Sequence, residues 1–229
     1  MEVSAADRQP FPVIAWKLLN TKGFRQPLIA FMVSIGISNA VSAFIGETLT
    51  RSGVDSVELI DLCGACFQLA IMFGSIFIGG YVDRSKKYKD VSLVLLAVSL
   101  FLLFPIGGGE HLDNSIVLGS LIALGVAVGP IQPINAELAV KVAYPEDENS
   151  IVALQQVCGN LFSALLVPVL AAAGTGHLGF MQGDYALLEV LAVSGLIYFA
   201  TFDAPLKRLE MDSASETKQP PPPAPEEVA

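Results

Sequence analysis

The chain has 229 residues, of which 53% are hydrophobic and only 15% are charged, and its mean hydropathy is +0.60. Soluble domains typically carry about 25% charged residues, so this composition predicts an integral membrane protein. The net charge of −9 comes without any basic stripe, which excludes a nucleic-acid-binding protein. The three cysteines form no disulfide framework and fit a reducing compartment or the bilayer interior.

Residues 1–26 precede the first long apolar run and are predicted to form a cytoplasmic and interfacial segment. Met1–Gln9 has no apolar stretch behind its charges, so it does not resemble a secretory signal peptide. Phe11–Arg25 combines Trp16 with several cations. This composition is typical of a helix at the membrane surface, with the indole at headgroup depth.

Six apolar runs follow, and most contain about 20 residues, enough for a helix to cross some 30 Å of hydrocarbon. They are predicted at 27–49, 59–82, 91–107, 116–140, 149–173 and 185–202. The expected fold class is therefore an all-α membrane protein with six transmembrane helices. These helices form one domain, 27–203, embedded in the lipid bilayer. No soluble fold accommodates six such runs in a chain of this length.

The positions of the cations indicate how the chain is oriented. Twelve of the 13 Lys and Arg residues fall before the first span, between the second and third, after the fourth or after the sixth. With an even number of spans these regions lie on one side of the membrane, and only Arg51 lies on the other. The positive-inside rule therefore predicts that both termini are cytoplasmic.

The polar segments outside the spans are predicted to be loops and a tail. Within Gly79–Asp90, six charges fall in the eight residues 83–90, which are expected to be a short solvated loop on the cytoplasmic side between the second and third spans. Residues 204–229 are expected to be a disordered, acidic, proline-rich cytoplasmic tail with polyproline II character. This tail either stays solvated or binds a proline-recognising domain.

No enzyme, cofactor or metal site is expected. His111 and His177 are isolated in the outer loops without a second ligand nearby. Cys63-Gly-Ala-Cys66 has the spacing of a thiol redox motif, but it lies within a membrane span with no cationic neighbour to favour a thiolate. The sequence contains no nucleophile elbow, phosphate-binding loop or paired catalytic acids. It therefore predicts no catalytic residue.

Polar side chains are unevenly distributed among the spans, and this distribution indicates which helices face protein or water. The span 91–107 is almost wholly apolar and is predicted to face lipid. The amides that are candidates for lining a solute cavity lie on four other spans: Asn39, Gln68, Gln132, Asn135, Gln156 and Asn160. Gln156, Asn160 and Ser163 form one stripe at helical spacing. Each such amide either lines a cavity or bonds a neighbouring helix, and the set of four helices favours half of a central cavity.

The fourth span carries the pattern Gly125-x-x-x-Gly129-Pro130-x-x-Pro133. Small residues four apart permit close approach of a neighbouring backbone. The prolines remove amide hydrogens and are predicted to kink this helix in its cytoplasmic half, freeing carbonyl groups that could face a cavity.

The sequence resembles the major facilitator superfamily. The resemblance is based first on the motif Gly79-x-x-x-Asp83-Arg84-x-Lys86-Lys87, which looks like the family's signature loop between the second and third helices of each half. Lys86 stands where the family has a glycine, so we expect a looser turn. A narrower resemblance is to the feline leukaemia virus subgroup C receptor family of haem- and choline-related transporters. Three blocks carry it: Trp16-Lys-Leu-Leu-Asn-x-Lys-x-Phe, Val82-Asp-Arg-Ser-Lys-Lys-Tyr-Lys and Glu137-Leu-Ala-Val-x-x-x-Tyr144-Pro145-x-x-Glu148.

The resemblance covers about residues 13–205 and matches the C-terminal half of such proteins. It implies a twelve-helix fold in which a small-molecule solute lies between two six-helix halves. A second six-helix half, from another chain or from the same longer protein, is therefore an expected partner. The family's choline-holding aromatic is matched here by Asn39, and a family glutamine falls near Gly159 or Asn160. Choline recognition through a cation–π contact is therefore not expected.

These observations predict the C-terminal half of a secondary transporter that moves a small polar or cationic organic solute by alternating access. The expected cytoplasmic gate consists of Asp83, Arg84, Lys87 and Glu137, the last paired with a lysine four residues later. The alternative is a non-transporting half-size membrane protein that binds or regulates a full-length relative. Both alternatives have the same topology.

Overall fold

The computed structural model describes residues 10–108, 112–208 and 211. It contains, in chain order, helices α1 (Phe11–Asn20), α2 (Arg25–Arg51), α3 (Val57–Ser85), α4 (Tyr88–Gly107), α5 (Asn114–Val128), α6 (Ile131–Ala143) and α7 (Glu148–Ala173), the strands β1 (His177–Leu178) and β2 (Met181–Gln182), and helix α8 (Gly183–Ala200). Most of the tail predicted at 204–229, and His111, lie outside the described residues.

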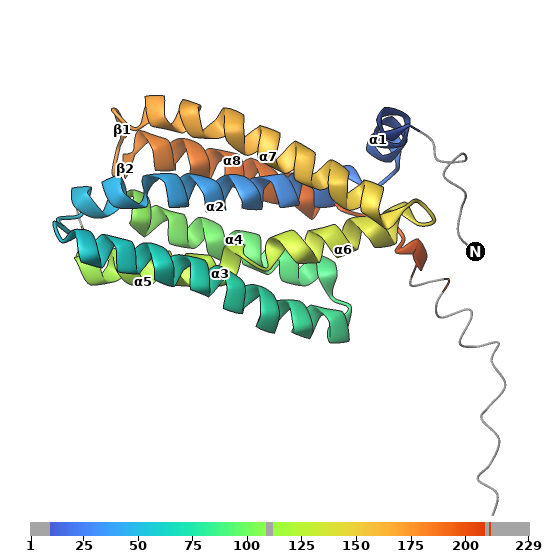
Figure 1. The fold of residues 1–229 in the computed structure, drawn as a ribbon, viewed down its shortest axis with the longest axis horizontal. Coiled ribbons are helices and arrows are strands. Elements are labelled where there is room, and N and C mark those ends of the chain that lie inside the picture. The colour runs from blue at the N-terminus through green and yellow to red at the C-terminus, as the bar shows by residue number, and fades with distance from the viewer. Residues whose placement is uncertain (1–9, 109–111, 209–210, 212–229) are drawn as a thin grey trace, which may run out of the picture.

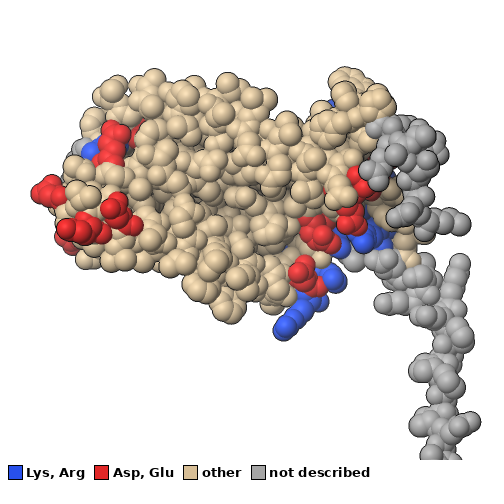
Figure 2. All heavy atoms as spheres, viewed as in Figure 1, with Lys and Arg blue, Asp and Glu red and all other residues tan. Residues whose placement is uncertain are grey.

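Six helical stretches are long and apolar enough to span a membrane, α5 and α6 together forming one of them. They run side by side along the long axis of the molecule (Figure 1). In the view of Figure 2, charged side chains gather at the two ends of this axis and leave an uncharged band between them. This arrangement suits a slab of hydrocarbon bounded by water on both sides. The predicted all-α, six-span membrane fold is therefore confirmed.

The spans differ in how much of their surface other helices cover. α2 packs against α6, α7 and α8, α3 packs against α5, and α4 packs against α5 and α8. α2 and the α5–α6 pair are the most buried spans, whereas α3 and α7 are the least buried. α3 and α7 therefore present long apolar faces to whatever surrounds the bundle.

The prediction of a solvated loop over residues 83–90 is wrong in its extent. α3 continues through Asp83 and Arg84, and α4 already begins at Tyr88, so only Lys86 and Lys87 lie between the helices. Lys86 ends α3 in the left-handed conformation, with φ of 58°. The charged side chains can remain on a helix because the last turn of a span lies at the membrane surface, where water can solvate them.

The fourth span is broken where the sequence predicts a kink. α5 ends at Val128, Gly129 and Pro130 form a turn, and α6 starts at Ile131. Ser34 of α2 donates a hydrogen bond of 2.9 Å to the carbonyl of Val128. This bond satisfies a carbonyl at the break, as buried backbone groups require.

The two glycines of the fourth span allow close contact with α3. A Cβ atom at Gly129 would lie 2.4 Å from the carbonyl oxygen of Ile71, and one at Gly125 would lie 2.8 Å from that of Phe67. The approach is reciprocal, because a Cβ atom at Gly74 of α3 would lie 2.5 Å from the carbonyl oxygen of Val126. The predicted role of these small residues in close helix packing is confirmed.

Two short elements lie outside the spans. β1 and β2 pair as an antiparallel hairpin between α7 and α8, a region for which the sequence predicts only a loop. α1, at the opposite end of the bundle, packs Leu18 into a buried cluster with Ala143, Ile151 and Leu154 of α6 and α7. The helix predicted within Phe11–Arg25 is therefore present.

Candidate functional site

Four of the six candidate cavity amides are exposed on one group of adjacent helices. Asn39 projects from α2, Gln68 from α3, and Gln156 and Asn160 from α7. α2 packs directly against both α3 and α7. These amides therefore lie on outward surfaces of the half-bundle, on or beside the two spans that the other helices cover least.

Two of these amides also connect neighbouring helices. The Asn39 side chain donates a hydrogen bond of 2.9 Å from Nδ2 to the hydroxyl of Ser163 on α7. Gln68 donates one of 2.9 Å from Nε2 to the hydroxyl of Ser42 on α2. An amide has two N–H donors and an oxygen acceptor, so one bond leaves most of its capacity open. Cavity lining and helix bonding are therefore not exclusive at Asn39 and Gln68.

Gln156 and Asn160 differ from this pair. Both side chains are exposed, and neither makes a hydrogen bond to any described residue. Gly159, which lies between them in sequence, is buried against the Ile35 and Phe31 side chains of α2. Ser163, on the same helical stripe as the two amides, bonds Asn39 of α2. The amides therefore lie on an exposed part of α7 that borders its contact with α2.

The remaining two candidates lie on α6, past the helix break. Gln132 is half-buried. Asn135 is fully buried, and its Nδ2 donates to the Ser92 hydroxyl of α4 at 3.1 Å and to the Ile131 carbonyl at 2.8 Å. The neighbouring Gln155 of α7, also fully buried, donates to the Asn135 carbonyl at 3.2 Å. In this structure Asn135 packs helices together and does not reach the outward surface.

A cavity of about 210 Å³ opens between α3 and α6, and it brings together two of the four candidate gate residues. Asp83 and Glu137 line it, together with Gly79, Pro133 and Ile134. Lys141 neutralises Glu137, so Asp83 is the carboxylate in this cavity that would favour a cationic occupant or partner side chain. The sequence names both acids, but their proximity follows only from the packing of α3 on α6.

The other two gate candidates, Arg84 and Lys87, are exposed at the same end of the bundle. The side chains of Arg84, Lys87 and Asp83 make no hydrogen bond or ion pair with any described residue. Asp83 and Arg84 therefore do not pair with each other here.

Glu137 does form the expected pair with Lys141, one turn later, at 2.7 Å. The lysine is buried, with 6% of its side chain exposed, and its ammonium lies 5.2 Å from the centre of the Tyr88 ring. The cation is thus held between a carboxylate of its own helix and an aromatic face of α4. The sequence reveals the ion pair by its spacing, but not the aromatic contact with α4.

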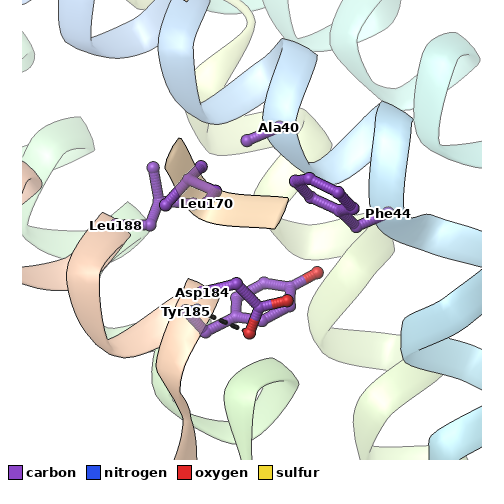
Figure 3. A pocket seen from close by; sticks show the side chains of 6 residues that line it. All are labelled: Ala40, Phe44, Leu170, Asp184, Tyr185 and Leu188. Carbon is purple, nitrogen blue, oxygen red and sulfur yellow. Dashed lines mark hydrogen bonds between the residues drawn. The ribbon is translucent and has the colours of Figure 1, made fainter. Parts of the chain in front are cut away.

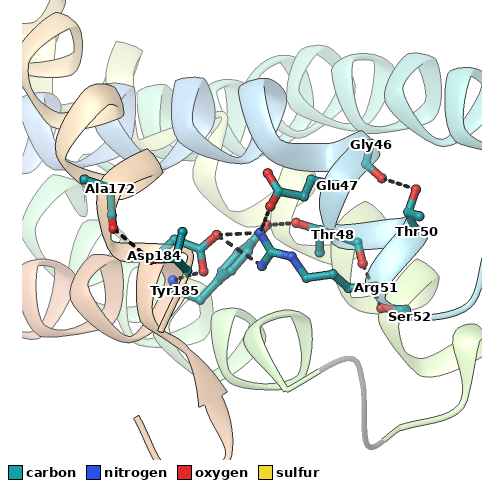
Figure 4. A network of polar contacts seen from close by, with 10 residues as sticks. Gly46, Glu47, Thr48, Thr50, Arg51, Ser52, Ala172, Asp184 and Tyr185 are labelled. Carbon is teal, nitrogen blue, oxygen red and sulfur yellow. Dashed lines mark hydrogen bonds and ion pairs between the residues drawn. The ribbon is translucent and has the colours of Figure 1, made fainter. Parts of the chain in front are cut away.

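The opposite end of the bundle holds a polar network that was not expected from the sequence (Figure 4). Arg51, at the end of α2, lies 2.5 Å from Glu47 and 3.3 Å from Asp184, a carboxylate in the first turn of α8 with 3% of its side chain exposed. The backbone N–H of Tyr185 also donates to Asp184, at 2.9 Å. The hydroxyl groups of Tyr185 and Thr48 are 2.9 Å apart. The signals present in the sequence are Arg51, the lone cation of its side, and an acid at a helix start.

A gap beside this network is lined mainly by apolar side chains, as Figure 3 shows, with Phe44 of α2 opposite Leu170 and Leu188. The gap leaves no room for a water molecule. Water therefore does not reach Asp184 from this side, and the carboxylate depends on its protein partners.

The cysteines and histidines contribute no visible metal site in the described part of the chain, where no group of three or more His, Cys, Asp or Glu side chains is placed to hold a metal ion. Cys63 is buried and Cys66 half-buried within α3, and neither forms a disulfide.

Comparisons with known proteins identify the family of this chain. The model of the Major Facilitator Superfamily matches residues 3–225. The chain is 28% identical over 155 residues to solute carrier family 49 member A3 of Xenopus tropicalis, covering 67% of the chain and 32% of that relative. It is 24% identical to the Danio rerio protein of the same name, covering 93% of the chain and 48% of the relative.

A third relative is the choline/ethanolamine transporter FLVCR2 of Rattus norvegicus, 28% identical over 204 residues, which cover 88% of the chain and 37% of the relative. The chain thus spans between about a third and a half of the length of these curated relatives. The resemblance to the feline leukaemia virus subgroup C receptor family is confirmed by these relatives. This chain belongs to the Major Facilitator Superfamily, as an integral, multi-pass membrane protein.

Proposed function

We propose that this chain forms the C-terminal six-helix half of a secondary transporter that moves a small polar or cationic organic solute by alternating access. One observation carries the proposal: Asn39, Gln68, Gln156 and Asn160 are exposed on membrane-spanning helices, with unused hydrogen-bonding capacity. Such groups are costly against lipid. A water-filled cavity or a solute would satisfy them.

The proposal requires a second six-helix half opposite these amides. Six spans with outward polar groups supply one wall of a cavity, and the chain matches only part of the length of its relatives. In this arrangement Gln132 lies beside the cavity, and Asn135 supports it from behind through its bonds to α4. The second half can come from another chain or from the same longer protein.

The solute class follows from the groups available. Amides bind hydroxyl and amine groups. Asp83, which lines the α3–α6 cavity without a side-chain partner among the described residues, favours a cation at that end. Choline and ethanolamine, named for the rat relative, are the first solutes to examine. Asn39 occupies the position where the family has an aromatic, so ethanolamine, which needs no aromatic cage, suits this half better than choline.

The orientation that we propose places both termini, and hence the Asp83 end, in the cytoplasm. It rests on the positions of the cations. In a background without Cys63, Cys66 and Cys158, cysteine introduced by Gly176→Cys should react with impermeant reagents from outside intact cells. Cysteine introduced by Lys86→Cys should not. Labelling of the Lys86→Cys variant but not of the Gly176→Cys variant would show that the orientation is the opposite of the one proposed.

The decisive experiment is ethanolamine and choline uptake into vesicles that contain this chain together with the N-terminal half of a curated relative. Asn160→Ala should raise the apparent KM several-fold without changing thermal stability, because Asn160 bonds no described residue. Asn39→Ala should also raise KM and in addition lower the free energy of unfolding by about 1 kcal/mol, the net contribution of one hydrogen bond.

Asn135→Ala is the matched control for these amides. Its side chain is fully buried and bonds Ser92, so its loss should reduce stability and leave KM unchanged. If Asn160→Ala leaves KM unchanged for every transported solute, the amides are not a solute site. If the paired halves transport nothing, a regulatory role for a half-size protein becomes the better hypothesis.

Asp83 provides a separate test of the gate. The side chain lines the α3–α6 cavity and bonds no described residue, so its proposed partner lies in the other half. When the two halves are paired, Asp83→Asn should leave insertion intact and shift the balance between inward-open and outward-open states, measured by cysteine accessibility in the cavity. A collapse of surface abundance with normal transport by the surviving protein would show that Asp83 is structural.

A further inference from the structure

Helix α1 has apolar side chains on two opposite faces, and the bundle covers only one of them. Leu18 is fully buried in the α6–α7 cluster, and Ile14 and Leu19 pack against the same cluster. Val13 and Trp16, three residues apart and so on one side of the helix, are 51% and 73% exposed. A large exposed indole on an otherwise docked helix indicates a second, apolar partner on that side.

The position of α1 identifies what lies against this outer face. α1 is located where α2 begins, at the end of the bundle that also holds the junction of α6 and α7. In Figure 1 it is seen nearly along its own axis, whereas the membrane-spanning helices run across the view. α1 therefore lies across the bundle, roughly parallel to the plane in which the spans end. Helices at the surface of a bilayer have this orientation.

The charge of the segment suits anionic headgroups. Residues 10–26 contain three cations, Lys17, Lys22 and Arg25, and no acid. Lys17 pairs with Glu146 at 2.5 Å, and Arg25 donates from Nε to the Leu19 carbonyl at 2.6 Å, which closes the end of α1. Lys22 is exposed and makes no hydrogen bond or ion pair with any described residue. It is the cation of this segment that is available to a lipid phosphate.

We infer that α1 lies on the bilayer surface, with the Trp16 indole at the boundary between headgroups and acyl chains and Lys22 against anionic headgroups. Tryptophan favours this depth because its ring is apolar and its N–H needs a polar partner. The inference rests on the six-span topology and does not depend on transport. A second six-helix half is the competing cover for the same face, and the experiment separates the two.

Trp16 is the only tryptophan of the chain, so its fluorescence reports on this face alone. The purified full chain is placed in phosphatidylcholine vesicles whose acyl chains carry bromine, a quencher of tryptophan fluorescence, either close to the headgroup or close to the terminal methyl group. Bromine close to the headgroup should reduce the Trp16 emission about two-fold, and bromine close to the terminal methyl group should reduce it less, as expected for a side chain at the interface. Aqueous iodide should quench weakly.

A buried tryptophan provides the control. In the double variant Trp16→Phe with Phe24→Trp, the indole replaces a ring that is fully buried beside α1, so neither quencher should act on it. Strong iodide quenching of Trp16 with no effect of bromine would overturn the inference. So would insensitivity of Trp16 to both quenchers, because the indole would then be covered by protein.

The charge preference is measured by energy transfer from Trp16 to dansyl-labelled lipids. Transfer to labelled phosphatidylserine should exceed transfer to labelled phosphatidylcholine, and added salt should reduce the difference. Lys22→Gln should reduce it as well. Lys86→Gln, which removes an exposed cation from the α3–α4 junction, is the matched control and should have no effect. Equal transfer to both lipids in the unmodified chain would contradict the role of Lys22.

Discussion

The two ends of the bundle accommodate charge in different ways. At one end, Arg51 is held between Glu47 at 2.5 Å and Asp184 at 3.3 Å, and Asp184 is almost completely buried. At the other end, Asp83 and Arg84 project from the last turn of α3 and make no bond within the described ranges. Arg51 thus finds its partners within the bundle, whereas Asp83 and Arg84 face its surroundings.

The buried charges contribute to the stability of the fold, whereas the exposed charges remain available to bind another partner. Removing one partner of a buried ion pair leaves an uncompensated charge and is strongly destabilising, while exposed charges contribute little to folding. The Arg51 end should therefore keep its shape, joining α2 to α8. Asp83 and Arg84 can change partners at little cost in stability, as the gate that we propose requires.

The largest expected effect is at the Arg51 end. Arg51→Ala should lower the free energy of unfolding by about 3–5 kcal/mol, because it leaves the Asp184 carboxylate buried and without its cation. Thermal or denaturant unfolding of the purified chain in detergent measures this loss. Arg84→Ala, the matched change at the exposed end, should cost less than about 0.5 kcal/mol.

Two further variants show whether the buried charge is the cause. Arg51→Ala combined with Asp184→Asn should recover part of the stability, because the second change removes the stranded charge. Glu47→Gln should cost less than about 1 kcal/mol, because 60% of the Glu47 side chain is exposed. Equal losses for Arg51→Ala and Arg84→Ala would contradict the proposed difference between the ends.

The sequence predicts much of the fold because each span carries its own signal. The six apolar runs, the break at Gly129 and Pro130 and the close approach at Gly125 are all local patterns, and the structure confirms them. The predicted extent of the α3–α4 loop is wrong, because a run of charges does not by itself indicate a loop. Charges at the surface are compatible with the last turn of a helix, and α3 continues to Ser85.

Contacts between distant segments could not be predicted in the same way. Arg51 and Asp184 are separated by 133 residues, and Asn39 and Ser163 by 124. A single sequence gives the polarity of each residue, but the partner depends on how the helices pack. For the same reason Asn135 appears in the sequence as one more cavity amide, although the packing of α4 on α6 buries it against Ser92.

The next largest effect is expected at Lys141, which is a buried cation although it lies at the Asp83 end, where other charges are exposed. Glu137→Gln should lower the free energy of unfolding by about 2 kcal/mol, because it removes the carboxylate 2.7 Å from the buried Lys141 and leaves only the Tyr88 ring as a charge partner. Thermal unfolding in detergent measures the loss.

The control for this prediction is a more exposed ion pair at the same end of the bundle. Lys17 and Glu146 are 2.5 Å apart with 59% and 21% of their side chains exposed, so Glu146→Gln should cost only about 0.5 kcal/mol. If both variants lose the same amount, burial of Lys141 does not set the strength of the pair, and the Asp83 end is uniformly weak in charge pairing.

The smallest expected effect is a gain in stability at the α3–α4 junction. Lys86 has φ of 58°, a conformation that costs a residue with a Cβ atom about 1 kcal/mol and costs glycine little. Lys86→Gly should therefore stabilise the chain by up to about 1 kcal/mol. Glycine also increases the conformational entropy of the unfolded state, which offsets part of this gain. Lys87→Gly, at φ of −87°, is the matched control and should only destabilise. The Lys86 side chain is exposed and bonds no described residue, and the backbone N–H of residue 86 can still donate to the Val82 carbonyl, so the substitution changes mainly the backbone conformational energy. A loss of stability in Lys86→Gly equal to that in Lys87→Gly would show that the left-handed turn carries no strain. In that case the lysine that replaces the family's glycine is accommodated there without cost.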